Sequence, residues 1–149
     1  MDPGGALIAI DTNLLIYAHR ASLPEHRAAR HAIEEASRDP RGWGIALPSV
    51  AEFWAIVTHP RSAGGASTAR QARGFLDSLI TEAGAQLWTA REGFWDRLLR
   101  LAGELRVQGP RIFDLQIGLT AFDNGAVEIW THDSRFVGFA GLRVHDPLE

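Results

Sequence analysis

Short apolar runs alternate with longer amphipathic stretches along this chain. The first run, residues 7–10 (Leu-Ile-Ala-Ile), contains two β-branched residues and no polar position, which is typical of a strand covered on both faces in a parallel sheet. Asp11-Thr12-Asn13 follows, and side chains of these types commonly begin helices. An apolar face continues after them. The pattern therefore predicts a strand that runs into a helix, with Asp11 at the junction.

The same alternation extends to the end of the chain. Apolar residues at intervals of three or four predict helices, and short apolar runs bounded by Gly, Pro or polar turns predict strands. After the first strand and helix, the expected helices are 24–38, 49–59, 69–83, 94–105 and 112–124, and the expected strands are 43–47, 86–89, 126–131 and 142–145. This order implies a single α/β domain over residues 1–149 with a doubly wound, mainly parallel sheet.

Four acidic residues fall where strands end or helices begin. Asp11 follows the first strand, Glu52 follows the second by a few residues, Asp114 lies in the first turn of the sixth helix and Asp133 follows the fourth strand. Because strand carboxyl ends and helix amino ends meet at one edge of a parallel sheet, the four carboxylates are expected to converge. Converging carboxylates repel unless cations neutralise them, and Mg²⁺ or Mn²⁺ suits such oxygen donors. The pattern indicates a site for one or two divalent ions.

Local structural explanations exist for three of the acids. Asp11 can cap the helix that follows it, and Asp114 is favoured by the dipole of its own helix. Ser49-x-x-Glu52 fits a capping box, in which Glu52 bonds back to the Ser49 amide. These explanations stay open for each residue alone. The coincidence of four acids at one edge favours a shared site.

Composition narrows the class of protein. The 149 residues, of which 46% are hydrophobic, can bury one ordinary core. No uncharged apolar run approaches ~20 residues, so no membrane span is expected, and the opening Met-Asp-Pro-Gly-Gly is unlike a signal peptide. The chain has no cysteine, which excludes disulfides and thiolate ligands and fits a cytoplasmic protein. A net charge of −3 argues against binding nucleic acid by charge alone.

Four segments, in order, resemble the motifs of PIN-domain ribonucleases. They are DTNLLIY at 11–17, PSVAEF at 48–53, FDLQIGL at 113–119 and THDSRF at 131–136. Their order and spacing, together with the total length, are similar to those of VapC-like toxins from bacterial toxin–antitoxin pairs. The resemblance covers nearly the whole chain.

This resemblance implies a three-layer α/β/α sandwich and a Mg²⁺- or Mn²⁺-dependent endoribonuclease that hydrolyses RNA phosphodiesters. It also implies a homodimer and inhibition by a small cognate antitoxin. By motif position, the catalytic and metal-binding residues would be Asp11, Glu52, Asp114 and Asp133, with Asp11 and Asp114 as the principal ligands, and the supporting residues would be Thr12, Asn13 and Thr131. Arg135 stands where the family often has a further Asp, which leaves a fifth acid and a second metal position open.

Two other classes of enzyme also place acids at strand ends. A receiver-type signalling domain normally needs a Lys near its acidic pocket, but all 15 basic residues of this chain are Arg. A haloacid-type phosphatase needs D-x-D after its first strand, where this chain has Asp11-Thr12-Asn13. The alternative that remains is a catalytically silent PIN-like module that only binds partners.

The expected antitoxin has a predicted mode of binding. It would lay apolar residues near Phe53 and Trp54 and extend an Arg toward Asp11 and Asp114, because a guanidinium fork can bond two carboxylates.

Overall fold

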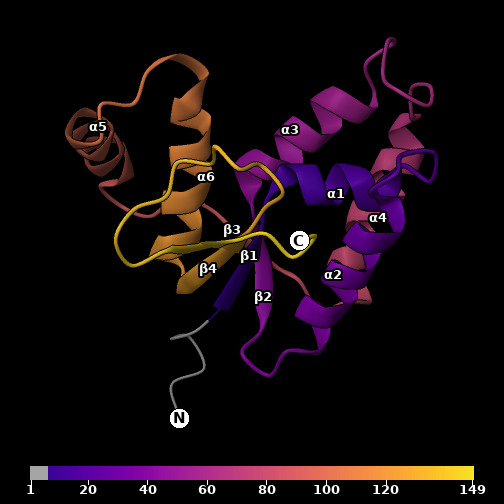
Figure 1. The fold of residues 1–149 in the computed structure, drawn as a ribbon, viewed down its shortest axis with the longest axis horizontal. Coiled ribbons are helices and arrows are strands. Elements are labelled where there is room, and N and C mark those ends of the chain that lie inside the picture. Colours follow the sequence, from indigo (N-terminus) through magenta and orange to yellow (C-terminus); the bar gives the residue numbers. More distant parts are fainter. Residues whose placement is uncertain (1–6) are drawn as a thin grey trace.

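The computed structural model describes residues 7–149 and contains a five-stranded sheet in the order β3-β2-β1-β4-β5 (Figure 1). All four strand pairings are parallel, which confirms the predicted α/β class. The strands are β1 (Leu7–Ile10), β2 (Trp43–Ala46), β3 (Gln86–Trp88), β4 (Ala126–Trp130) and β5 (Arg143–His145). The Met-Asp-Pro-Gly-Gly opening, on which the signal-peptide expectation rests, lies outside the described residues.

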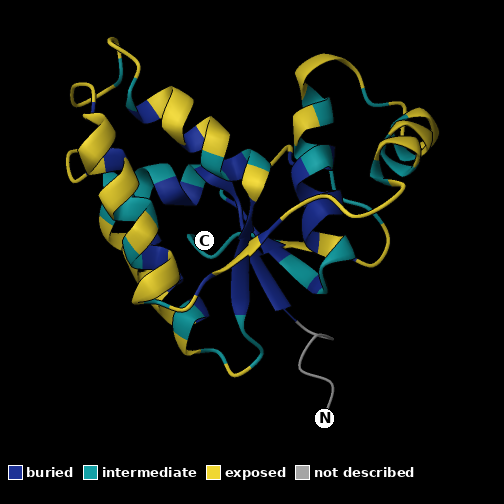
Figure 2. Cartoon of the chain, turned by 180° about the vertical axis from the view of Figure 1, so that it is seen from behind, coloured by how far each residue is buried: buried dark blue, intermediate teal, exposed yellow. Residues whose placement is uncertain are grey.

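Helices cover both faces of this sheet and complete the three layers. Helices α1 to α4 pack on one face, whereas α6 packs on the other with α5 on its outer side (Figures 1 and 2). The helices are α1 (Thr12–His19), α2 (His26–Arg38), α3 (Leu47–Val57), α4 (Ala69–Thr81), α5 (Phe94–Glu104), the 3₁₀ helix η1 (Gly109–Arg111) and α6 (Ile112–Asp123). None of the helices in residues 7–149 is long and apolar enough to cross a membrane.

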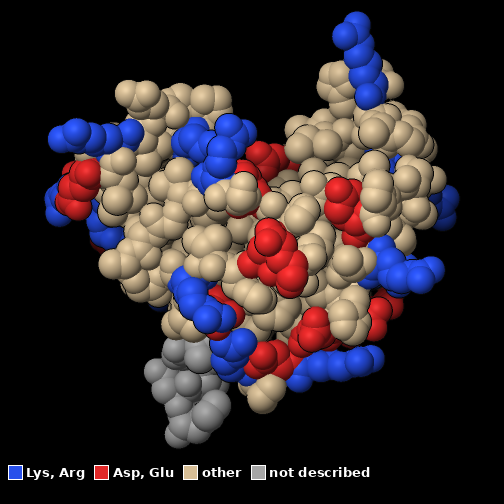
Figure 3. All heavy atoms as spheres, in the orientation of Figure 1, with Lys and Arg blue, Asp and Glu red and all other residues tan. Residues whose placement is uncertain are grey.

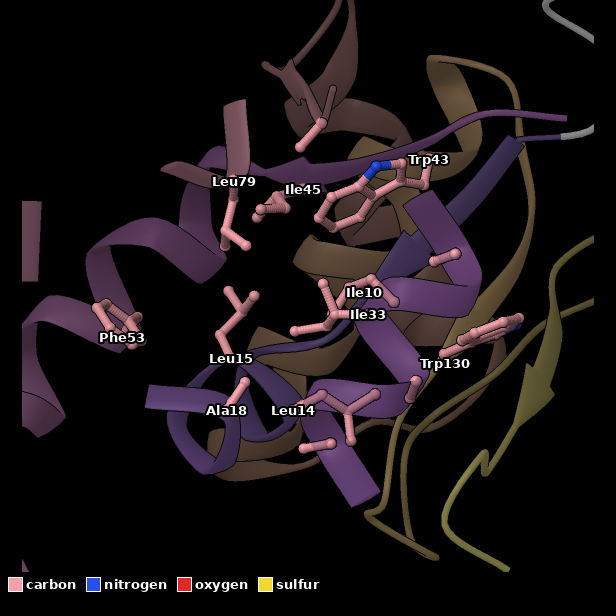
Figure 4. Packing of buried hydrophobic residues seen from close by; sticks show 14 of the residues in the cluster. Ile10, Leu14, Leu15, Ala18, Ile33, Trp43, Ile45, Phe53, Leu79 and Trp130 are labelled. Carbon is pink, nitrogen blue, oxygen red and sulfur yellow. The ribbon is translucent and has the colours of Figure 1, made fainter. Parts of the chain in front are cut away.

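The central strand β1 divides its side chains between two hydrophobic clusters. Ile8 and Ile10 face the α1–α4 side, and Leu7 and Ala9 face the α6 side, as the two-residue period of a strand requires. Every residue of β1 is buried because both faces are covered, which explains its uninterrupted apolar sequence. Figure 4 shows the first cluster, in which Ile10 is surrounded by Leu14, Leu15, Ile33, Trp43 and Trp130.

The order of the strands places a topological switch point beside β1. From β1 the chain continues to β2 and β3 on one side, and it later returns to place β4 and β5 on the other. In doubly wound sheets, ligands bind outside the carboxyl ends of the strands where the strand order reverses. Here that place lies between β1 and β4, next to the residues that follow each strand.

The start of α3 differs from the prediction. The sequence predicted a strand through Leu47, closed by Pro48, with a helix from Ser49. In the structure the helix already begins at Leu47 and Pro48 lies in its first turn. Proline is tolerated there because the first-turn N–H groups have no partner within the helix, and its fixed φ suits a helix. The other predicted helices and strands are present and differ from the prediction only at their ends.

The earlier start of α3 removes the predicted capping box. Ala46 is the capping residue and makes no side-chain hydrogen bond, whereas Ser49 lies inside the helix. The buried Ser49 hydroxyl has no hydrogen-bond partner among the described residues. The prediction that Glu52 bonds back to the Ser49 amide is therefore wrong. Glu52 is left available for another role.

Candidate functional site

Asp11 lies at the junction of β1 and α1 and caps α1, so the structural explanation of this residue is confirmed. Its backbone is extended, which turns the carboxylate over the first turn of the helix, where Oδ1 accepts a hydrogen bond from the Thr12 N–H at 2.8 Å. Oδ2 accepts from the Thr131 hydroxyl at 2.8 Å and from the Asn13 side-chain amide at 3.2 Å. Of the residues predicted to support Asp11, Asn13 and Thr131 contact it through their side chains. Thr12 contacts it only through its backbone N–H, and the buried Thr12 hydroxyl has no hydrogen-bond partner among the described residues.

The environment of Asp11 disfavours its negative charge. Burial raises its pKa to about 6, against the opposing effect of the hydrogen bonds from Thr131 and Thr12. The negative charges of Glu52 and Asp114 raise the pKa further, so both carboxylates act on Asp11. A nearby cation would stabilise the charged form of such a carboxylate and lower its pKa.

The Thr131 hydroxyl joins the β1 and β4 sides of the site. It donates to Asp11, and its oxygen accepts from the Asn13 side-chain amide at 2.8 Å and from the Asp133 N–H at 3.1 Å. Asn13 in turn accepts from the His132 N–H at 3.0 Å. Thr131 is buried, so these contacts fix the loop after β4 against the start of α1.

We expect Thr131→Val to destabilise the fold measurably. Valine keeps the shape but leaves donors from Asn13 and Asp133 without their shared acceptor, and a buried polar group left unsatisfied costs about 1–3 kcal/mol. The control is Thr120→Val, since Thr120 is equally buried but its hydroxyl bonds only the Gln116 carbonyl of its own helix within residues 7–149. Urea unfolding measures both changes. Equal stability of the two variants would contradict the joining role of Thr131.

Asp114 and Asp133 meet through an arginine that the sequence analysis did not identify. One nitrogen of Arg111, Nη1, donates to Asp114 Oδ2 at 2.9 Å and to Asp133 Oδ2 at 2.8 Å. Asp114 Oδ2 also accepts from the Val137 N–H at 3.3 Å. Burial is the largest single influence on the pKa of Asp133 and raises it. The hydrogen bonds from Arg111 and from the Arg135 N–H, together with the positive charges of both arginines, lower the pKa overall.

Glu52 is the least constrained of the four acids. It is exposed on α3 and makes no hydrogen bond or ion pair within residues 7–149. Its charge nevertheless contributes to the raised pKa of Asp11. The structure thus brings Asp11, Glu52 and Asp114 within electrostatic reach of one another, and Arg111 connects Asp133 to Asp114.

The donor set at this edge suits a hard divalent cation. In Figure 3, acidic atoms lie in the hollow between the α6 side and the α1–α3 side of the molecule. In the part of the chain that the structure describes, no three Asp, Glu or His side chains are grouped closely enough to hold a metal as they stand. Mg²⁺ needs only one or two carboxylates because it keeps several waters. Asp114 and Asp133 both accept a hydrogen bond from the same nitrogen of Arg111. One oxygen of each acid therefore faces a shared position that a cation can occupy.

Sequence reasoning could have found only half of the Arg111 arrangement. The spacing of Arg111 and Asp114 is i, i+3, which places two side chains on the same helical face. The contact with Asp133, 22 positions away, has no local signal.

Arg135, the departure from the family pattern, donates its backbone N–H to Asp133 Oδ1 at 2.9 Å. The His132 ring is hydrogen bonded to Asp146 at 2.8 Å.

The surface predicted for an antitoxin needs one correction. Phe53 is fully buried between His19 and Phe75 and is not available to a partner. Trp54 is 40% exposed, and Ile56 on the same helix is 42% exposed. The sequence placed Phe53 and Trp54 together on the apolar face of this helix, and periodicity alone does not say which of them a second layer covers.

Known protein families include one whose sequence model matches most of this chain. The model of the PIN domain matches residues 8–142. The chain belongs to the PIN-domain family. Ribonuclease VapC43 of Mycobacterium tuberculosis is 29% identical to this PIN domain over 143 residues, which cover 96% of the chain and 97% of the relative.

Two solved structures share the fold of this PIN domain. VapC20 of Mycobacterium tuberculosis, described as a toxin that cleaves the sarcin–ricin loop, superposes with a TM-score of 0.67 at 14% identity, covering 91% of this chain and 98% of its own. VapBC-5 of the same organism, a member of the VapBC family of toxin–antitoxin systems, gives a TM-score of 0.53 at 20% identity, covering 95% and 98%.

Proposed function

We propose that this PIN domain is a divalent-metal-dependent endoribonuclease and the toxin of a toxin–antitoxin pair. The observation that carries the proposal is the meeting of Asp11, Asp114 and Asp133 at the switch point between β1 and β4, with Glu52 nearby. The naming of VapC43 as a ribonuclease and of VapC20 as a loop-cleaving toxin supports RNA as the substrate class.

The chain's own residues prepare this site for hydrolysis. Asp11 and Asp114 are the principal residues that would hold Mg²⁺ or Mn²⁺, and Glu52 and Asp133 complete the set. When bound, such an ion supplies positive charge at the scissile phosphate and activates a water. Thr131 and the Thr12 N–H fix the two oxygens of Asp11. Glu52, exposed and unbonded within the described residues, is free to accept a hydrogen bond from an approaching water.

The test is cleavage of a mixed RNA pool by the purified protein. We expect fragments with Mg²⁺ or Mn²⁺, none with EDTA, and recovery of cleavage when the metal is restored in excess. Fragments that persist in EDTA would contradict the metal requirement. The absence of cleavage with either metal would contradict the enzyme.

One observation favours the silent binding module as the second candidate. Arg111 already pairs with Asp114 and Asp133 and balances one of their two negative charges, so part of the acidic site is satisfied without any metal. A module of this kind would show no cleavage under any metal condition, although it would still bind its partner. The RNA assay therefore separates the two functions.

The proposal includes a protein inhibitor that binds beside α1 and α3. A cavity of about 470 Å³ opens there, lined by apolar side chains that include Ile16, Leu23 and Ile56 and also by Arg20 and Arg61. No acidic residue of the described chain lines it. An amphipathic antitoxin segment would place apolar residues in it, and VapBC-5 supports the presence of such a partner through its naming as a toxin–antitoxin system.

We expect the small protein encoded beside this one to bind it and to block cleavage. Ile56→Arg should weaken that binding at least tenfold, because it places a charge in the apolar contact. Ile80→Arg is the matched control, since Ile80 is 39% exposed on α4 and does not line this cavity. Titration calorimetry measures the binding of the neighbouring protein to the wild type and to each of the two variants. A neighbour that neither binds nor inhibits would contradict the toxin assignment and leave the nuclease assignment standing.

The proposal also covers assembly and location. Trp95 and Leu99, one turn apart on α5, are 71% and 56% exposed, and an apolar pair of this kind supports the homodimer that the resemblance implies. A cytoplasmic location follows from the proposed RNA substrates.

A further inference from the structure

Arg111 connects two acids of the candidate site, which distinguishes it from the other ion-paired arginines of the described chain. Arg73 and Arg100 each bond an acid four residues away on their own helix, and Arg41 bonds Asp39 and Glu128 through separate nitrogens. Arg111 brings together two acids of the candidate site with a single nitrogen, one from the start of α6 and one from the loop after β4.

The bonds of Arg111 use the oxygens that a cation at this site would need. Nη1 contacts Oδ2 of Asp114 and Oδ2 of Asp133, at 2.9 Å and 2.8 Å. A metal ion held by Asp114 and Asp133 would compete with Arg111 for these oxygens. Two positive charges cannot share that space without strong repulsion, because the interaction of charges grows as their separation falls. The guanidinium and a metal therefore exclude each other.

The side chain has room to leave. Arg111 is about one-third exposed and is the last residue of η1, immediately before α6, so its outer atoms border solvent. Its side-chain hydrogen bonds within residues 7–149 go only to Asp114 and Asp133. Rotation about its own side-chain bonds releases both acids, and neither η1 nor α6 has to move.

We infer that Arg111 is a positioning residue that acts as a built-in competitor of the metal: its guanidinium holds Asp114 and Asp133 together in the metal-free protein and is displaced when a divalent cation binds. This inference rests on the proposed function, because it assumes that the two carboxylates are metal ligands. Its consequence is that the metal affinity of this chain is lower than its acids alone would provide.

The test is Mn²⁺ binding to wild type, Arg111→Gln and Arg135→Gln by titration calorimetry, without RNA. Arg111→Gln should bind Mn²⁺ at least several-fold more tightly, because no cation has to be displaced. Arg135→Gln is the matched control, since the charge of Arg135 also acts on Asp133 but only its backbone N–H bonds that residue. An unchanged or weaker affinity in Arg111→Gln overturns the inference, and so does an equal gain in both variants, which would reveal a general charge effect.

A second measurement uses the wild type and does not depend on the folding of a variant. We expect the Arg111 side-chain N–H signals in nuclear magnetic resonance spectra to shift on addition of Mg²⁺ and to exchange with water faster. Signals that stay unchanged while Mg²⁺ binds would overturn the displacement. If neither wild type nor Arg111→Gln binds Mn²⁺, the proposed metal site fails and the inference with it. If wild type binds and the variant shows no gain, the inference alone fails.

Discussion

Asp11→Asn is expected to reduce divalent-dependent RNA cleavage by roughly a thousandfold while the protein stays folded. A metal ion supplies several kcal/mol of stabilisation to a reacting phosphate, and each ~1.4 kcal/mol corresponds to a factor of ten in rate. Asparagine removes the negative charge but keeps an oxygen that can still accept the Thr12 N–H, so α1 remains capped. Initial rates with Mn²⁺ in excess measure the loss.

The matched control is Asp77→Asn on α4. Asp77 is exposed and, among the described residues, its side chain pairs only with Arg73 on its own helix, so its substitution removes the same charge far from the site. It should cleave RNA at the wild-type rate. A folded Asp11→Asn protein that retains most of its activity would contradict the assignment of Asp11.

In EDTA, the free energy of unfolding of the wild type should fall relative to that of Asp11→Asn as the pH rises from 4 to 7. The folded-state pKa of Asp11, about 6, lies above the ordinary value of 3.8. Between these values the folded protein binds more protons than the unfolded chain, so stability decreases with pH through this window. A shift of one pKa unit corresponds to ~1.4 kcal/mol of stability. The difference in free energy of unfolding between wild type and variant should therefore change by about 3 kcal/mol across this window.

Urea unfolding at a series of pH values measures this change, and the difference from Asp11→Asn removes the contribution of other groups. Three other acids have lowered pKa values and therefore oppose this trend, because they stabilise the fold more as the pH rises: Asp133, Asp39 and Glu128. Both proteins contain these acids, so their contribution cancels in the difference. A difference between wild type and variant that does not vary with pH would show that Asp11 titrates normally.

The fold was largely predictable because strands and helices leave different periods in the sequence. The run of residues 7–10 was typical of a strand covered on both faces, and β1 is indeed buried throughout. The start of α3 was not predictable by the same rule. Pro48 reads equally well as the end of a strand or as a residue of a first helical turn, and the structure has the second. The capping box of Ser49 and Glu52 was wrong for this reason.

The candidate site was predictable where its residues follow strands. Asp11 and Asp133 come just after β1 and β4, and the parallel arrangement of these strands brings their ends to one edge. Arg111 was not predictable, because its contact with Asp133 depends on how a long side chain crosses from η1 to a loop 22 positions away. The burial of Phe53 depended likewise on α1 and α4, which no local pattern records.

We propose that the edge formed by Asp11, Asp114 and Asp133 binds a divalent cation. Paramagnetic broadening of backbone amide signals by substoichiometric Mn²⁺ tests it directly. We predict selective broadening around residues 11–13, 114 and 131–133. The cluster of Asp39, Glu128 and Arg41 is an internal control for binding to other acids. Broadening centred on that cluster, or spread evenly over the surface, would contradict the claim.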